Sequence, residues 1–335
     1  MTSLQRGAPP SARHADAPAK GPSRPQHRRR KDPGSRGRFL SSVDLKASPY
    51  LFIAPFFLLF GAFGLFPLLY TVWVSFHEWS LIGGNEGFIG LDNYVRLFSD
   101  AKFWNSLYNT LGIFVIAVIP QLLVALLLAD TLNRAVRGKS FFQMTMILPY
   151  ITSIAALAIV FSQLFGSEFG LINQALGYLG IDPINWRGEK YFSWGAIAFM
   201  IDWRWTGYNA LIYLAAMQSV PKDVYEAASL DGASRMRQFF QITIPMLRPT
   251  IIFTVIISTI GQMQLFTEPA IFDTGGAMQG GTQGQFQTVM MLVFQEAFRY
   301  GNYGYGSAIA WVLFMLVVLL GLINVVMTSR IRSAT

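Results

Sequence analysis

Polar and ionisable side chains stand inside several of the long apolar stretches of this chain. They carry amide, carboxylate and guanidinium groups: Gln121, Asp202, Arg204, Asn209, Gln262, Gln264 and Glu268. A polar group at membrane depth is costly, so such groups often mark a solute pathway or a proton relay. We therefore predict a substrate path that includes Tyr208, Asn209, Gln262, Gln264 and Glu268.

The alternative role for these side chains is structural, because polar groups in membrane helices also hydrogen-bond to neighbouring helices. For Asp202 and Arg204 we favour this structural role. They lie two positions apart and therefore on different faces of a helix.

Other site chemistry finds little support in the sequence. The chain has no cysteine, and His14, His27 and His77 are scattered without a metal-binding spacing, so we predict no metal and no cofactor. The stretch Asn133–Ser140 ends like a phosphate-binding loop. It has Asn133 where the first glycine belongs and follows an apolar stretch instead of a strand, so we predict no nucleotide site.

The elements that position these residues follow from composition. Hydrophobic residues make up 53% of the 335 residues, charged residues only 13%, and the mean hydropathy is +0.40. We predict an all-α integral membrane protein, because a helix of about 20 apolar residues crosses the hydrocarbon core. Six stretches are long enough: Leu51–Val74, Leu107–Ala129, Phe142–Phe165, Trp194–Met217, Thr250–Ile271 and Ser307–Thr328. Pro120 and Pro149 predict kinks in two of them.

The first 46 residues differ from the rest of the chain. They hold 11 Lys or Arg and 3 Asp or Glu, a net charge of +8 that equals the net charge of the whole protein. This tail is rich in Pro, Ser, Gly and Arg, so we predict that it is disordered. Its charge would attract anionic membrane lipid, or nucleic acid in a membrane-anchored nucleic-acid binder. We favour lipid and predict no nucleic-acid partner, which an electrophoretic shift with DNA would test.

The orientation of the spans follows from the distribution of Lys and Arg. With the tail in the cytoplasm, the segments on that side carry 20 of these residues and the outer loops carry 5. Six spans also place both termini on the same side. We therefore predict a multi-pass cell-membrane protein with cytoplasmic termini and with residues 219–249 exposed to the cytoplasm.

Residues 219–249 carry the signals of two short helices. Pro221 can begin a helix, Asp231-Gly232 supplies a break, and a second helix is predicted from about Ser234 until Pro245 and Pro249 stop it. Met236, Phe239 and Phe240 recur at helical spacing beside two arginines, which predicts an apolar face with a basic rim. From the residues alone, this face fits either a soluble partner or the lipid headgroup region.

A longer pattern in this segment decides between the two. Glu226-Ala227-Ala228, Asp231-Gly232-Ala233, Ile242 and Pro245 resemble the EAA loop of permease subunits in bacterial binding-protein-dependent ABC importers, especially the maltose and glycerol-3-phosphate type. Other stretches resemble the carbohydrate-uptake branch, so that the resemblance covers about residues 51–328: Gly87–Leu111, Glu168–Gly180, Trp203–Pro221 and Leu265–Ala277.

The resemblance implies a type-1 ABC importer permease fold and a transport subunit that is not itself an enzyme. It implies as partners a second permease subunit, two ATP-binding subunits and an extracytoplasmic sugar-binding protein that delivers a sugar, expected to be an oligosaccharide. Within the EAA loop, Glu226 would be a polar contact to the ATPase, Ala227 and Ala228 would allow close packing, and Gly232 would make the turn; Asp231, Ile242 and Pro245 complete the predicted coupling site.

Two questions remain open at this stage. The aromatic side chains of Trp203, Trp205 and Tyr208 could stack on sugar rings or anchor the helix at the membrane interface. An ion- or proton-coupled secondary transporter of a small polar solute is the alternative function, although most acidic residues lie in loops and at helix ends.

The predicted organisation is a tail at 1–46, the first transmembrane helix and outer loop at 47–105, the permease domain at 106–328 and a C-terminal segment at 329–335.

Overall fold

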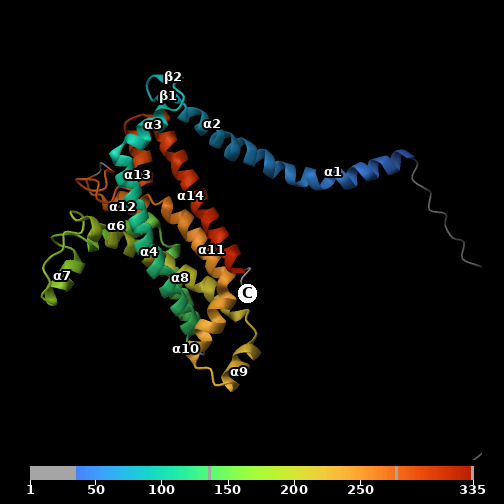
Figure 1. Ribbon diagram of the computed structural model, residues 1–335, viewed down its shortest axis with the longest axis vertical. Helices are drawn as coiled ribbons and strands as arrows, with labels where there is room; N and C mark the ends of the chain where they lie inside the picture. Colours follow the sequence, from blue (N-terminus) through green and yellow to red (C-terminus); the bar gives the residue numbers. More distant parts are fainter. Residues whose placement is uncertain (1–34, 135–136, 276–277, 333–335) are drawn as a thin grey trace, which may run out of the picture. The chain divides into compact units, whose positions relative to one another are not determined.

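The computed structural model describes residues 35–134, 137–275 and 278–332, and the side chains within 48–134, 137–275 and 278–326. The chain falls into two units, one that ends at Phe63 and one that begins at Gly64 (Figure 1). The described part of the first unit consists of α1 (Ser35–Phe60) and the first residues of the π-helical turn η1 (Gly61–Leu65).

The predicted disorder of residues 1–46 does not hold for their last part, because α1 already begins at Ser35. Apolar residues such as Phe39, Leu40 and Val43 precede the first apolar stretch, with several polar residues and Pro49 in between. Extending an existing helix is much easier than nucleating one, so the helix continues backward into this stretch. Residues 1–34, with the rest of the predicted tail, lie outside the described residues.

The second unit is built mainly of helices. They are α2 (Phe66–Ser75), α3 (Asp92–Ser99), α4 (Ala101–Asn133), α5 (Lys139–Ile151), α6 (Ile154–Leu164), α7 (Leu171–Tyr178), α8 (Lys190–Gln218), α9 (Lys222–Leu230), α10 (Arg235–Gln238), η2 (Phe239–Thr243), α11 (Ile244–Met263), α12 (Thr267–Phe272), α13 (Val289–Phe294), η3 (Gln295–Arg299) and α14 (Tyr303–Arg332).

A small hairpin departs from the all-α prediction. Strands β1 (His77–Ser80) and β2 (Gly84–Phe88) pair antiparallel between α2 and α3. Asn93 fixes the base of the hairpin, since its Nδ2 donates to the carbonyl oxygens of Ser75 and His77. The prediction missed this hairpin because two strands of four and five residues are too short to show a period in the sequence.

Four segments of the described chain are long and apolar enough to cross a membrane: Ser48–Ser75, Ala101–Asn133, Arg235–Phe272 and Tyr303–Val326. The pair α5 and α6 makes a fifth if both helices belong to one span. Helix α8 has 29 residues but is not among these segments. Asp202, Arg204 and Asn209 lower its hydropathy, although its length is sufficient.

Two predicted spans are interrupted. The stretch Phe142–Phe165 is not one helix, because α5 and α6 meet at an angle of 92° around Thr152 and Ser153. Pro149 lies just before this break, so the predicted kink is a full bend. The stretch Thr250–Ile271 is interrupted at residues 264–266, between α11 and α12. By contrast, α4 continues through Pro120 as one helix.

Helix α4 lies beside α8 over much of their length. Helix α8 in turn lies against α5, where a Cβ atom at Gly207 would overlap the carbonyl oxygen of Met146. Only glycine allows the two backbones to come so close. Helix α14 lies beside α11, as Figure 1 also shows.

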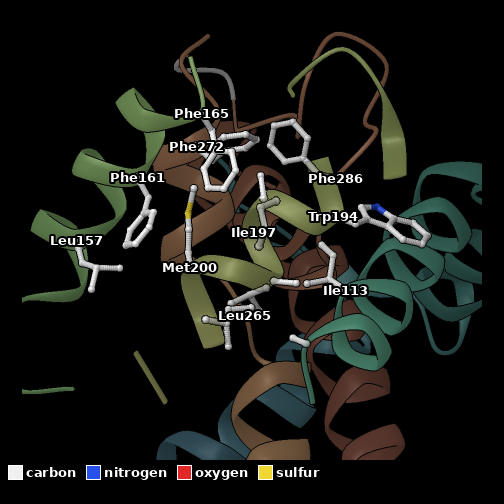
Figure 2. Close-up of a cluster of buried hydrophobic side chains, with 14 residues drawn as sticks. Ile113, Leu157, Phe161, Phe165, Trp194, Ile197, Met200, Leu265, Phe272 and Phe286 are labelled. Atoms are coloured by element: carbon white, nitrogen blue, oxygen red, sulfur yellow. The ribbon is translucent and has the colours of Figure 1, made fainter. Parts of the chain in front are cut away.

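A buried cluster joins α4, α6, α8, α12 and the loop before α13. Figure 2 shows Phe161 of α6 and Met200 of α8 converging with Leu265 and Phe272, while Trp194 lies beside Ile113 of α4. Arg187 locks the same region: its Nε donates to the carbonyl oxygen of Phe272 at 3.0 Å and its Nη2 to that of Ser162 at 2.6 Å. Burial lowers the pKa of Arg187, and the charge of Asp273 opposes this effect.

Large apolar side chains also cover the outer surface of the helices. On α4, Ile119, Leu123 and Leu127 are each more than half exposed, and Leu319 and Leu322 do the same on α14. A soluble protein seldom exposes so many large apolar groups together. Such surfaces fit contact with lipid chains or with other membrane helices.

Candidate functional site

The EAA segment (residues 219–249) folds through short local contacts. Helix α9 starts after Pro221 and ends at the turn Asp231-Gly232, as the sequence predicts. Gly232 has a φ of +75°, its N–H donates to the carbonyl oxygen of Ser229, and the N–H of Ala233 donates to that of Ala228. This pair of bonds is a Schellman ending, which favours glycine at its left-handed position.

The second half of the segment differs from the prediction. Ser234 caps α10, and Gln238 reaches back to the hydroxyl of Ser229 and the carbonyl oxygen of Ala233. The predicted stop at Pro245 and Pro249 is wrong, because the π-helical turn η2 leads directly into α11, which contains both prolines. Pro245 lies in the first turn of α11, where a missing N–H costs little.

The EAA segment is attached to the helix bundle at one end. Phe239 and Leu247 are buried in a cluster with Leu126 of α4 and Tyr213 of α8. The hydroxyls of Tyr225 in α9 and Thr243 in η2 lie 3.0 Å apart. This contact joins α9 to the turn η2, which leads directly into α11.

The remaining surface of the segment faces outward. Glu226, Ala227 and Asp231 are exposed, as is Pro245, while Ala228 and Ile242 are partly buried. The predicted apolar face is only partly buried, because Phe239 is buried whereas Leu230, Met236 and Phe240 are 89%, 68% and 58% exposed. The segment therefore presents an exposed surface that combines polar groups with large apolar side chains, a combination that also occurs at protein interfaces.

A second site lies in the interior of the bundle. A cavity of about 160 Å³ is lined by several of the polar residues named from the sequence: Gln121, Arg204, Gln262, Gln264 and Glu268. They come from α4, α8, the end of α11 and α12. The fold thus brings together polar side chains that are up to 147 positions apart in the sequence.

Hydrogen bonds define the wall of this cavity. Gln262 Nε2 donates to Gln121 Oε1 at 2.9 Å, and both side chains are buried. Gln262 Oε1 and Arg204 Nε have no hydrogen-bond partner among the described residues. One unpaired acceptor and one unpaired donor are therefore buried in side chains that line the cavity.

The interruption of the fifth span helps to form the cavity. Gln264, Leu265 and Phe266 lie between α11 and α12 and all line it. Thr288 donates from its hydroxyl to the carbonyl oxygen of Leu265 at 2.8 Å, which satisfies a backbone group that the helix break would leave open. Glu268, 3% exposed, stands in the first turn of α12.

Other predicted residues lie outside the cavity lining. Asn209 is buried, and its Nδ2 has no partner among the described residues. Tyr208 stacks on Tyr150 with ring centres 4.5 Å apart. Asp202 Oδ1 is buried without a hydrogen bond in the described structure, so the predicted interhelical bond of this atom is not seen.

The sequence reasoning missed some of the lining. Ser258 and Thr267 contribute to the cavity, and Ile154 enters it from the bend between α5 and α6. Tyr150 is not part of the lining but contacts a lining residue, since the guanidinium carbon of Arg204 is 5.5 Å from the centres of the Tyr150 and Trp205 rings. Ser258 lies four positions before Gln262, so helical spacing could have found it. No sequence signal points to Ile154 or Tyr150.

The chain is similar to known transport proteins over most of its length. A family model described as the binding-protein-dependent transport system inner membrane component matches residues 44–333. The arabinooligosaccharides transport system permease protein AraP of Bacillus subtilis (strain 168) is 34% identical over 305 residues, which cover 90% of this chain and 94% of the relative. The lactose transport system permease protein LacF of Rhizobium radiobacter is 36% identical over 279 residues, 82% and 92% of the two chains.

The fold has a solved counterpart. A chain in the crystal structure of a bacterial alginate ABC transporter in complex with an alginate pentasaccharide-bound periplasmic protein matches with a TM-score of 0.74. The match covers 88% of this chain and 98% of the other, at 19% sequence identity. At this identity the likeness establishes the fold, and the function rests on the closer relatives.

Proposed function

Since the chain belongs to the family of binding-protein-dependent transport system inner membrane components, we propose that it is the membrane-spanning subunit of an ATP-driven sugar importer. The observation that carries this proposal is the 34% identity to an arabinooligosaccharide permease over 90% of the chain. The sugar, an oligosaccharide in this proposal, is delivered by an extracytoplasmic binding protein, and ATP is hydrolysed by separate subunits.

We also propose that the chain crosses the membrane six times with both termini in the cytoplasm. The four apolar segments, the bent pair α5–α6 and the polar helix α8 supply the six crossings. The excess of Lys and Arg supports the side assignment. The EAA segment then faces the cytoplasm, and the hairpin β1–β2 faces outward.

In this arrangement the EAA segment is the contact to the ATPase. Glu226 and its exposed neighbours meet one of two ATP-binding subunits, and a second permease subunit offers its own loop to the other. The buried root at Phe239 and Leu247 supports a mechanical role, since it ties the loop to α4 and α8. Closure of the ATPases would move α9 and α11 together and change access to the interior.

The central cavity is this chain's contribution to the sugar path. Gln262 and Arg204 line the cavity, and each has a buried polar atom without a hydrogen-bond partner among the described residues. A sugar hydroxyl, which can both donate and accept, would satisfy either atom once the side chain turns toward it. Arg204 and Glu268 line the same cavity with opposite charges, which supports an uncharged substrate. A volume of about 160 Å³ suits one part of a glycan, and the second permease would supply the remaining wall.

Reconstitution tests the proposal. The chain would be purified with its second permease and ATPase subunits, placed in liposomes, and supplied with the binding protein and a labelled neutral oligosaccharide. We expect uptake only with ATP and binding protein together. Uptake driven by an ion gradient without ATP would instead support the secondary transporter. Thermal-shift screening of the binding protein against mono- and oligosaccharides would identify the sugar.

A further inference from the structure

A second polar cleft lies far from the central cavity, at the N-terminal end of α4. It has a volume of about 370 Å³, in the range of about 300–1,000 Å³ that is usual for ligand sites. Its polar lining comes from the start of α4, the loop before α13 and the start of η3: Lys102, Asn105, Gln279, Gln283, Gln287 and Gln295. We call it the amide cleft.

The floor of the amide cleft is already ordered. Gln287 and Gln295 are 5% and 2% exposed, and Gln287 Nε2 donates to Gln295 Oε1 at 2.9 Å. Asn105 Nδ2 donates to the carbonyl oxygen of Gly284 at 2.7 Å, and Lys190 Nζ donates to Asn105 Oδ1 at 2.9 Å. A ligand therefore meets amides whose positions are fixed before it binds.

The exposed rim of the amide cleft carries amide groups that can form further hydrogen bonds. Gln279 and Gln283 are exposed, and each side chain offers an acceptor oxygen and a donor NH₂ group. Among the described residues that line the amide cleft, Lys102 is the one that is charged, and none is aromatic. Protein interfaces are enriched in aromatic residues, Met and Arg, so this lining fits the hydroxyl groups of an uncharged glycan better than a protein loop.

The position of the amide cleft separates it from both sites described above. At the other end of α4, Asn133 and Arg134 adjoin the EAA segment. The amide cleft and the EAA segment therefore lie at opposite ends of α4, which is about 50 Å long. Gln121 of the central cavity lies 16 residues beyond Asn105, or about 24 Å along the helix. The amide cleft therefore faces outward if the EAA segment faces the cytoplasm.

We propose that the amide cleft is an entry subsite that holds a neutral glycan through its hydroxyl groups before the glycan reaches the central cavity. This inference rests on the proposed sugar import. It assigns a role to Gln279 and Gln283 as specificity-determining residues at the outer mouth, where the binding protein would release its sugar.

The test uses the complete transporter in nanodiscs without binding protein, and neutral di- to pentasaccharides of glucose, galactose and arabinose as probes. Saturation-transfer NMR measures glycan affinity. We expect Q279A/Q283A to weaken it about tenfold, since two hydrogen bonds are lost. The matched control Q174A removes an exposed glutamine of α7 outside the amide cleft and should leave the affinity unchanged.

Uptake in liposomes and titration of the binding protein separate the remaining outcomes. The entry subsite is wrong if wild type and Q279A/Q283A bind the glycan with equal affinity, or if the variant loses only its affinity for the binding protein. In either case, sugar import by the wild-type transporter would leave the proposed function intact. The acidic glycan trigalacturonate tests the preference for neutral glycans. If it binds as tightly as the neutral probes, and if K102Q abolishes this binding, that preference is wrong. A wild-type transporter that imports no glycan overturns both the subsite and the proposed function.

Discussion

The EAA segment and the central cavity are built in opposite ways. In the EAA segment, the bonds that shape the α9 turn and α10 join residues within nine positions of each other, and the side chains left over point outward. In the cavity, the bond between Gln121 and Gln262 joins residues 141 positions apart, and both side chains are buried. A local shape exposed at the surface suits a partner, whereas a buried convergence suits a ligand that the protein must enclose.

The difference also predicts how each region fails. A change in the EAA segment should interrupt coupling to the ATPase while the bundle stays folded. A change in the cavity should alter both the affinity for sugar and the stability of the bundle, because the same side chains serve both. Four substitutions, from the largest expected effect to the smallest, test this contrast.

Gly232→Pro should abolish uptake. Proline holds φ near −65° and has no N–H, whereas Gly232 needs a φ of +75° and donates to Ser229. We expect transport in liposomes to fall by at least about a hundredfold, with membrane insertion intact, because the local cost is about 3 kcal/mol or more. Gly232→Asn is the matched control and should keep most activity, since Asn tolerates left-handed backbone. Normal uptake by the proline variant would remove the EAA segment from the coupling path.

Glu226→Lys should also abolish uptake by reversing an exposed charge at the proposed ATPase contact. A like-charge contact at an interface costs several kcal/mol, so co-purification with the ATPase should fall about a hundredfold. Asp223→Lys is the control, because it reverses another exposed acid on α9. If co-purification with the ATPase falls equally in both variants, the loss results from the overall charge of α9, and the proposed specific role of Glu226 is wrong.

Gln262→Leu should raise the sugar concentration for half-maximal uptake about tenfold and lower stability by about 1–3 kcal/mol, because Gln121 Oε1 loses its donor. The double variant Gln121→Leu/Gln262→Leu removes both polar partners. We expect it to regain much of the stability without regaining uptake. Thermal unfolding measures the stability, and uptake kinetics measure the transport. If the double variant regained both, Gln121 and Gln262 would have a structural role only.

Tyr225→Phe should have the smallest effect. It removes one hydroxyl contact, at 3.0 Å, to Thr243, which is worth about 0.5–1.5 kcal/mol. We expect a modest rise in ATP hydrolysed per sugar imported, with little change in thermal stability. Tyr178→Phe, at a side chain 92% exposed, is the control. An unchanged ratio would show that α9 does not act on η2 through this contact.

Much of the fold and the outline of the EAA segment could be predicted from the sequence. Apolar length identified four segments that are long and apolar enough to cross a membrane, and Pro221 and Gly232 marked the start of α9 and its turn. These signals act over a few neighbouring residues. The stop at Pro245 was wrong, since a proline in the first helical turn does not end a helix. The strands of the hairpin β1–β2 are too short to show a period. The break between α11 and α12 is accompanied by a hydrogen bond from the distant Thr288, which no local pattern reveals.

The sequence by itself determined that this is a helical membrane protein, which residues are too polar to face lipid and where its exposed loop turns. Each of these follows from hydropathy or from the backbone preferences of single residues. Only the tertiary structure decided that Gln121, Arg204 and Gln262 share one cavity while Asn209 and Tyr208 do not line it. The physical reason is that the angle and rotation of packed helices depend on close contacts such as that of Gly207 with Met146, which a single segment does not encode.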